Sequence, residues 1–224
     1  MTALTTGISS PLSPAVAPPP TRPHTESMRR RRRALRHLAS AVTVVTVRNG
    51  DRLHGATVGS ATLVSRNPLL LGLCLRSGSA TAGLIREEGR FAVNVLAGDQ
   101  ASVARFFSDP NRPLGAAQFA ATGWDPAPGS GAPLLRGALA HFSCRIATQV
   151  LVGDHEVLLA HVHDAVARDG KPLLSYDGNL HTVAQPSAGP IAAHPAPGFP
   201  GAAVTAAAQP APRPRLHTPI EQED

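Results

Sequence analysis

Two hydroxyl side chains stand at the start of a short helical pattern in the middle of the chain. Ser79 and Thr81 precede the apolar pair Leu84–Ile85, and Gly89 follows, which is typical of a helix that spans about residues 79–90. The free N–H groups and the dipole at a helix start favour a negatively charged group. The sequence therefore predicts an anion site here, while an ordinary N-cap role explains the serine equally well without a ligand.

A histidine follows a tight turn later in the chain. Gly153–Asp154 separates two alternating segments, and His155 is the first residue after this turn. Imidazole changes its charge near neutral pH and can hold or polarise a substrate. Taken alone, a histidine in this place is most often a surface residue, and Asp154 is typical of a turn rather than of a general base. His155 is still the strongest single candidate for a catalytic side chain.

Other reactive residue types are less informative. His161 and His163 share a strand face, but no carboxylate or thiol is placed to complete a metal site with them and His141. We therefore predict solvent-facing imidazoles and no metal. Arg105 lies on a predicted helix, as a surface residue or as a partner for a phosphate group. The sequence contains neither GxGxxG after a strand nor GxxxxGK[ST], which argues against a Rossmann or P-loop nucleotide site.

The elements that must position these residues are mostly strands. A β-branched run at 42–47 ends at Asn49–Gly50, a strong hairpin turn, and residues 138–152 alternate, with Val150 and Val152 on the apolar face. Further strands are predicted at 52–60, 69–75, 91–96 and 155–167, helices at about 30–41, 79–90 and 100–107, and a Pro/Gly-rich connection at 108–133. This pattern predicts a mainly β fold that forms a closed or partly closed barrel.

Composition divides the 224 residues into one domain and two tails. Residues 1–33 hold six of the 22 prolines and residues 185–224 hold nine, so we predict disordered tails around a domain at 34–184. Five of the six excess positive charges also lie in 1–33, mainly in Arg29–Arg33. Neither interleaved aromatics nor a groove-reading motif accompanies this tract, so we predict a solvated arm and no nucleic-acid function.

Hydropathy and the cysteine pattern indicate in which cellular compartment the protein works. The sequence lacks any run of ~18 apolar residues, which excludes a membrane-spanning helix. Cys74 and Cys144 lack the spacing of a zinc site or a disulfide scaffold, as is typical of the reducing cytoplasm. We therefore expect a cytoplasmic protein that makes no contact with membranes.

Seven short motifs follow one another along residues 34–184. They are Ala41–Thr46, His54–Ser60, Ser65–Leu71, Cys74–Leu75 with Ser79–Thr81, Gly89–Leu96 with Gln100, Arg105–Phe106 and Gly153–His155. In this order and spacing they resemble the short-chain flavin reductases of two-component monooxygenase systems. The resemblance implies a split β-barrel of the Greek-key, FMN-binding type, usually a homodimer, that reduces FMN, or FAD, with NADH or NADPH. It also implies that the reduced flavin diffuses to a separate monooxygenase.

The resemblance assigns roles to individual residues. The matching histidine of the family lies near the nicotinamide, which makes His155 the predicted catalytic residue. Its loss should slow the reaction rather than abolish it, because hydride passes directly between the two cofactors. The predicted cofactor-binding residues are Thr57, Val58, Ser60, Asn67, Ser79, Thr81, Arg105 and Phe106. Among these, Ser79 and Thr81 are expected to hold the flavin phosphate, and the backbone of 57–62 is expected to contact the ring.

Three other functions share some of these features. A non-catalytic flavin-binding or electron-carrying module would use the same barrel without consuming nicotinamide. A barrel of the pyridoxamine-phosphate oxidase type would need basic groups for a second phosphate, and Lys171 is the only lysine of the chain. A nucleic-acid binder would depend on Arg29–Arg33 and would lose affinity with salt. The presence of His155 favours the reductase.

Overall fold

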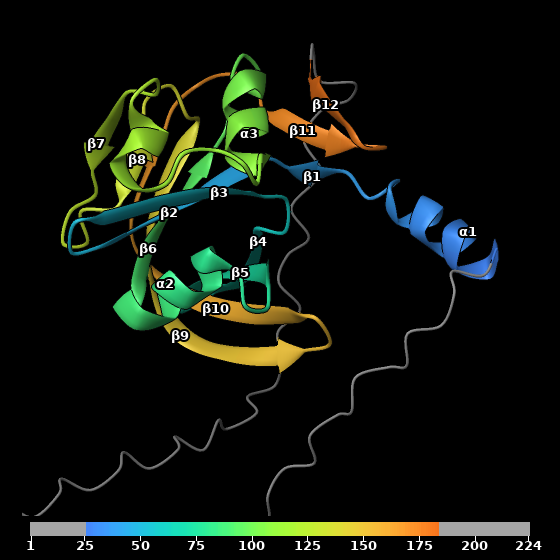
Figure 1. Ribbon diagram of the computed structural model, residues 1–224, viewed down its shortest axis with the longest axis horizontal. Coiled ribbons are helices and arrows are strands. Elements are labelled where there is room, and N and C mark those ends of the chain that lie inside the picture. The colour runs from blue at the N-terminus through green and yellow to red at the C-terminus, as the bar shows by residue number, and fades with distance from the viewer. Residues whose placement is uncertain (1–25, 184–224) are drawn as a thin grey trace, which may run out of the picture. The chain divides into compact units, whose positions relative to one another are not determined.

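A computed structural model of the chain describes residues 26–183, which are drawn as the coloured ribbon in Figure 1. Residues 1–25 and 184–224, which include most of the two predicted tails, lie outside the described part. The elements are α1 Glu26–Leu35, β1 Ser40–Ala41, β2 Thr43–Asn49, β3 Arg52–Val58, β4 Thr62–Arg66, β5 Leu69–Arg76, α2 Ala80–Glu88, β6 Arg90–Val95, α3 Ala101–Ser108, the 3-10 helix η1 Gly115–Phe119, β7 Trp124–Pro126, β8 Pro133–Leu135, β9 Ala140–Val152, β10 His155–Ala167, β11 Leu173–Tyr176 and β12 Asn179–Thr182. The predicted mainly β fold with a few short helices is confirmed. The helices described are all too short or too polar to cross a bilayer.

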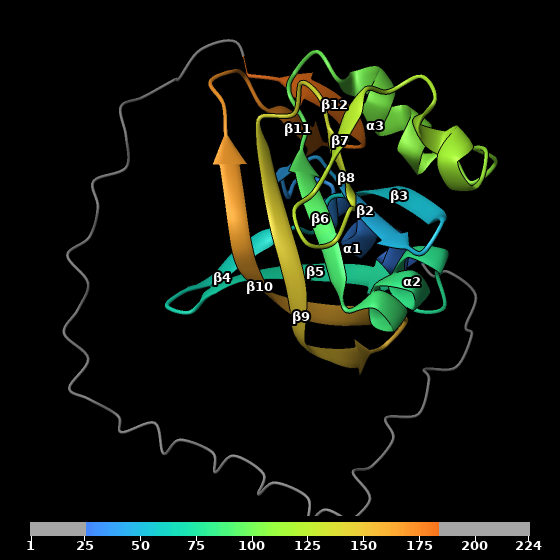
Figure 2. The same cartoon turned by 90° about the vertical axis from the view of Figure 1, so that its left-hand side faces the viewer.

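The hydrophobic core packs on a curved antiparallel sheet. Its strand order is β3-β2-β6-β9-β10-β5-β4, so β3 and β4 form its two edges. Figure 2 shows β9 and β10 running along the height of the view while β4 and β5 cross it. Register shifts between β9 and β10 at Leu159/Ala160 and Val162/Asp164 accompany this curvature, since an extra residue in one strand bends and twists it.

Two apolar clusters lie on the two sides of β2, whose first five residues are all buried. One cluster packs α2 against the sheet through residues such as Ile85, Phe91 and Leu158. The other packs α3 and η1 around Phe107 and Phe119. A strand that is covered on both faces reads as a continuous β-branched run, which is why Val42–Val47 was a strong sequence signal.

A small second sheet of order β1-β11-β12 joins the two ends of the described chain. Ser40 of β1 pairs with Ser175 of β11, and the β11–β12 hairpin turns at Asp177–Gly178, with φ of 47° and 76°. No strand is predicted for this segment from the sequence. An Asp-Gly pair between short apolar runs is a turn signal that could have found the hairpin.

Several predicted boundaries are wrong. The helix predicted at 30–41 lies at Glu26–Leu35, because the arginine-rich stretch has good helix propensity whereas the chain becomes extended by Ser40. Residues 26–33, assigned above to a disordered tail, are therefore helical. The first hairpin turns at Gly50–Asp51, one residue later than predicted, because Asn49 still pairs with Arg52.

The far half of β9 departs from the predicted inward face. Val150 and Val152 are 56% and 57% exposed, and Leu151 between them is 65% exposed. Their alternation is correct, but this end of β9 extends past the apolar clusters, so the three side chains of Val150–Val152 stay exposed. This hairpin end is an exposed apolar surface.

Candidate active site

Strand pairing brings the two main groups of candidate residues to one end of the sheet. His155 is the register partner of Arg76, the last residue of β5, and the N–H of Ser77 donates to the Asp154 carbonyl over 3.0 Å. Helix α2 begins three residues beyond Ser77. The hydroxyl groups at the start of α2 and the imidazole of His155 are therefore held by adjacent segments.

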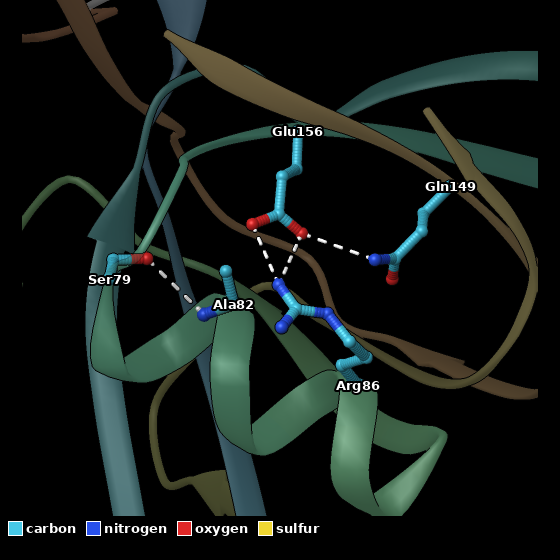
Figure 3. A network of polar contacts seen from close by, with 5 residues as sticks. All are labelled: Ser79, Ala82, Arg86, Gln149 and Glu156. Atoms are coloured by element: carbon cyan, nitrogen blue, oxygen red, sulfur yellow. Dashed lines mark hydrogen bonds and ion pairs between the residues drawn. The ribbon is translucent and has the colours of Figure 1, made fainter. Parts of the chain in front are cut away.

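The start of α2 is a capped helix terminus. Ser79 has extended backbone angles, φ −69° and ψ 150°, and its Oγ accepts a hydrogen bond from the Ala82 N–H over 3.2 Å (Figure 3). The predicted N-cap role of Ser79 is confirmed. Thr81 is 4% exposed, and its Oγ1 lies 3.1 Å from Nε2 of His54. The terminus thus presents ordered polar groups.

A hollow of about 580 Å³ opens beside this terminus. It is lined by His54, Ala56, Thr57, Arg76, Ser79, Ala80, Thr81, Phe107, Ser108, Pro110, Arg112 and Leu114. Burial lowers the pKa of His54 to about 4, and the Arg112 charge acts in the same direction. His54 is therefore neutral near pH 7, and Arg76 and Arg112 supply the positive charge around the two hydroxyls.

Arg112 is a residue that sequence reasoning missed. Its Nη2 donates to the Gly55 carbonyl over 2.7 Å, and its Nη1 donates to the Asp109 carbonyl over 2.7 Å. These contacts fix the guanidinium within a loop that the sequence identified only as a Pro/Gly-rich connection. Arg76 was missed as well, although its place at a strand end just before the hydroxyl pair was a usable signal.

A second hollow of about 380 Å³ lies along α3 and shares Thr57 and Ser108 with the first. Its lining also includes Gly59 and Arg105, and β11–β12 contribute Ser175, Gly178, Asn179 and Leu180. The Thr57 Oγ1 donates to the Ala104 carbonyl over 2.7 Å, which ties β3 to α3 between the two hollows. We call the two adjoining hollows the α3 groove.

His155 lies at the hairpin next to the α3 groove rather than in its lining. Its side chain is 45% exposed, and its Nδ1 lies 2.8 Å from Oδ1 of Asp154, whose side chain is 91% exposed. The hydrogen bond with His155 holds the pKa of Asp154 below its usual range. An ionised Asp154 accepts a hydrogen bond from Nδ1–H of His155, which leaves Nε2 of the ring without this contact. Arg76, which lines the groove, is the register partner of His155.

The other predicted cofactor residues occupy different environments. Val58 is 8% exposed in the core, and Phe106 packs edge-on against Phe107, with ring centroids 5.2 Å apart. Ser60 Oγ accepts from the Cys74 N–H and donates to the Cys74 carbonyl, each over 2.9 Å. Asn67 lies in the exposed turn between β4 and β5. The structure thus brings Thr57, Ser79, Thr81 and Arg105 together around the α3 groove. The remaining four predicted residues do not line it; they are Val58, Ser60, Asn67 and Phe106.

The three histidines considered as metal ligands occupy different environments. They are His141, His161 and His163. The solvent-facing position predicted for His141 is wrong: the residue is buried, because its Nε2 lies 2.8 Å from the Leu135 carbonyl and satisfies this backbone group. His161 and His163 have ring centroids 6.4 Å apart on β10. Within residues 26–183, no three His, Cys, Asp or Glu side chains gather as a metal site requires.

Comparison with known proteins gives a consistent picture. A family model described as "Flavin reductase like domain" matches residues 35–184. The NADPH-flavin oxidoreductase of Streptomyces viridifaciens is 40% identical over 159 residues, which cover 70% of this chain and 82% of that protein. The reductase component of a 4-nitrophenol 4-monooxygenase/4-nitrocatechol 2-monooxygenase from Rhodococcus opacus is 34% identical over 149 residues, covering 66% and 77%.

A solved structure extends the similarity to the fold. The Streptomyces globisporus NADH:FAD oxidoreductase, in complex with NAD and FAD fragments, superposes with a TM-score of 0.66 at 32% identity. The match covers 70% of this chain and 93% of that one. The family model matches residues 35–184, which contain the sequence motifs, the curved sheet and its groove. The chain belongs to the flavin reductase-like family.

Proposed function

We propose that this protein is an NAD(P)H-dependent flavin reductase that supplies reduced flavin to a separate monooxygenase. One observation carries the proposal: the capped start of α2 places two hydroxyls and two arginines beside a groove. The strand before α2, β5, pairs with β10, which begins at His155. Relatives that are flavin oxidoreductases or reductase components of monooxygenases support it.

The residues around the α3 groove fit a flavin nucleotide. Its phosphate carries negative charge, and Arg76, Arg112 and the hydroxyls of Ser79 and Thr81 offer donors and positive charge at one end. The groove continues to Gly59, where an added Cβ would lie 3.3 Å from Oγ of Ser40, so little room remains beside the backbone. Arg105 and the polar residues of β11–β12 line that end and can contact the remainder of the nucleotide.

The flavin supplies the chemistry by accepting a hydride from nicotinamide, so the protein needs mainly to align two flat rings. Thr57 and the α2 terminus hold the flavin, and His155 holds the nicotinamide ring against it. Because Asp154 accepts a hydrogen bond from Nδ1–H, the Nε2 atom of His155 is left to contact the nicotinamide or its carboxamide. FMN and FAD both carry the phosphate that the α2 end would bind.

The split-barrel architecture also belongs to this proposal. The edge strand β3 is followed by Ser60, whose hydroxyl bonds both backbone groups of Cys74 in β5. This side chain links two parts of the sheet that no strand ladder joins, as expected where a barrel is split. The exposed Val150, Leu151 and Val152 supply an apolar surface of the kind that a homodimer covers. Both cysteines are free, in keeping with a cytoplasmic location.

The test is steady-state oxidation of NADH and NADPH by the purified protein without flavin and with added FMN, FAD or riboflavin. Saturable oxidation that requires flavin, and a slower rate for His155→Ala, is the expected result. Binding of FMN without consumption of either nicotinamide would instead favour the non-catalytic module. Light scattering on the wild type and on Leu151→Asp tests the homodimer, since a charge in a buried apolar interface should give monomers.

A further inference from the structure

A buried carboxylate lies next to His155. Glu156 is 5% exposed, and both of its oxygens accept a hydrogen bond from Nη2 of Arg86 over 2.8 Å. Its Oε2 also accepts from Nε2 of Gln149 over 3.2 Å, as Figure 3 shows. We call Arg86, Gln149 and Glu156 the Glu156 network. Apolar residues often stabilise a core as well as a buried ion pair does, so stability alone does not account for a charge at this point.

The Glu156 network joins the two parts of the candidate site. Arg86 lies on α2 seven residues after Ser79, which is about two turns along the same side of a helix. Figure 3 shows Ser79 capping one end of α2 while Arg86, further along the helix, points at Glu156. Glu156 follows His155 directly in β10, and Gln149 lies on the strand that enters the same hairpin.

Strand geometry places the two neighbours on opposite faces of the sheet. Consecutive residues of a strand alternate, so His155 is partly exposed while Glu156 points to the buried side. A second tie, from the Ser77 N–H to the Asp154 carbonyl, lies just before α2. The backbone tie before the helix and the Glu156–Arg86 pair two turns into it together fix both the distance and the tilt of α2 relative to the hairpin.

We propose that Glu156 and Arg86 are positioning residues for hydride transfer. They hold the start of α2, which binds the flavin phosphate, in register with His155, which holds the nicotinamide. In the reaction a hydride leaves C4 of the reduced nicotinamide with both electrons and bonds to N5 of the oxidised flavin, giving oxidised nicotinamide and anionic reduced flavin. The inference rests on the proposed roles of Ser79, Thr81 and His155.

A flavin without a phosphate separates positioning from stability. FMN is anchored at α2, so a shift of the helix displaces its ring from the nicotinamide. Riboflavin has no such anchor and finds its place from the ring alone. A defect in positioning therefore affects FMN selectively, whereas a general loss of folded protein affects both flavins equally.

The experiment compares kcat and KM for FMN and for riboflavin in Glu156→Gln, well below its thermal midpoint. We expect kcat with FMN to fall about 10- to 100-fold, the range expected for a small misplacement of reacting groups. The KM for FMN should change less than about threefold, because the phosphate contacts move with α2, and kcat with riboflavin should stay within about twofold. Arg86→Lys keeps a cation near the carboxylate and should lose less FMN activity than Arg86→Met.

Asp125→Asn is the matched control. It removes one carboxylate from the exposed Asp125–Arg136 ion pair of 2.7 Å, neither residue of which lines the groove, and should leave both rates unchanged. If Glu156→Gln does not fold, the Arg86 variants provide the same comparison, because the Arg86 side chain is 53% exposed.

Two results would overturn the inference: equal losses with FMN and riboflavin, or an unchanged rate with FMN. Failure of the proposed function is a different result. It would appear in the wild type as no nicotinamide oxidation with either flavin.

Discussion

The two ends of the candidate site differ in how completely their side chains are buried and hydrogen-bonded. We call the more ordered α2 end the built end. At the α2 end, Thr81 and His54 are buried, and Arg112 is fixed by backbone carbonyls. At the hairpin end, the His155 side chain is 45% exposed and Asp154, its one side-chain partner in the described part of the chain, is 91% exposed. The first end is therefore ordered by contacts within the chain, whereas the second is open to solvent.

The largest effect on stability should come from truncating a buried side chain that lines the built end. Phe107 is 1% exposed and packs against Phe106 and Phe119. Phe107→Ala should lower the free energy of unfolding by about 3–5 kcal/mol, measured by urea denaturation. Thr148→Ala, at an exposed position of β9, should change it by less than about 0.5 kcal/mol. Similar losses in both variants would contradict the difference between the two ends.

A smaller effect is expected from one hydroxyl at the built end. Thr81→Val keeps the shape of the side chain but removes a hydrogen bond to a charged ligand, which contributes about 1.5–3 kcal/mol. The KM for FMN should therefore rise about tenfold or more, while the KM for riboflavin stays within about twofold. An equal rise for both flavins would show that Thr81 does not contact the phosphate.

At the hairpin end the expected effect is on rate rather than on affinity for flavin. His155→Ala should slow flavin reduction about tenfold, which corresponds to ~1.4 kcal/mol, without abolishing it. Rapid mixing of nicotinamide with the flavin-loaded protein measures this step. Asp154→Asn retains the imidazole and loses only its charged acceptor, so its rate should fall by a smaller factor. A larger defect in Asp154→Asn than in His155→Ala would reverse the assigned roles.

The smallest effect is a pH dependence specific to the built end. The pKa of His54 is lowered from 6.5 to about 4, so the unfolded chain binds this proton more readily than the folded one. Stability from His54 is therefore fully present above pH 6.5 and is lost as the pH falls toward 4. We expect a loss of about 1 kcal/mol across this window, after allowing for solvent screening.

The variant His54→Gln isolates this contribution. Its unfolding free energy, followed by urea titration at several pH values, should depend less on pH between 6.5 and 4 than that of the wild type. The lowered pKa of Asp154 acts in a different range, because stability from that carboxylate is lost only as the pH falls below its usual 3.8. Parallel curves for the wild type and His54→Gln would show that His54 is not buried in solution.

Local sequence signals were sufficient where one segment determines its own environment. The β-branched run of β2, the N-cap Ser79 with Gly89 at the other end of α2, and the turn at Gly153–Asp154 all lie as predicted. Gly89 has a φ of 70°, which glycine adopts at little cost. Each of these features depends on side-chain shape or backbone freedom within a few residues.

Features that depend on distant segments could not be predicted in the same way. Arg112 points into the groove because the loop after α3 folds back on Gly55, and no local pattern specifies that contact. Val150 and Val152 alternate like core residues, but their exposure depends on where the rest of the sheet ends. The partner of Glu156 lies 70 residues away on α2, so the charge could not be recognised as buried from its neighbours.

The β1-β11-β12 sheet has a consequence for folding. Ser40 pairs with Ser175, and the Asn179 end of this sheet lines the α3 groove. Contacts between residues so far apart in sequence form slowly, because the chain between them must be ordered first. On the ribosome, the groove cannot be completed until β12 has left the exit tunnel, so the α2 end of the site can form before the β11–β12 wall that closes the other side.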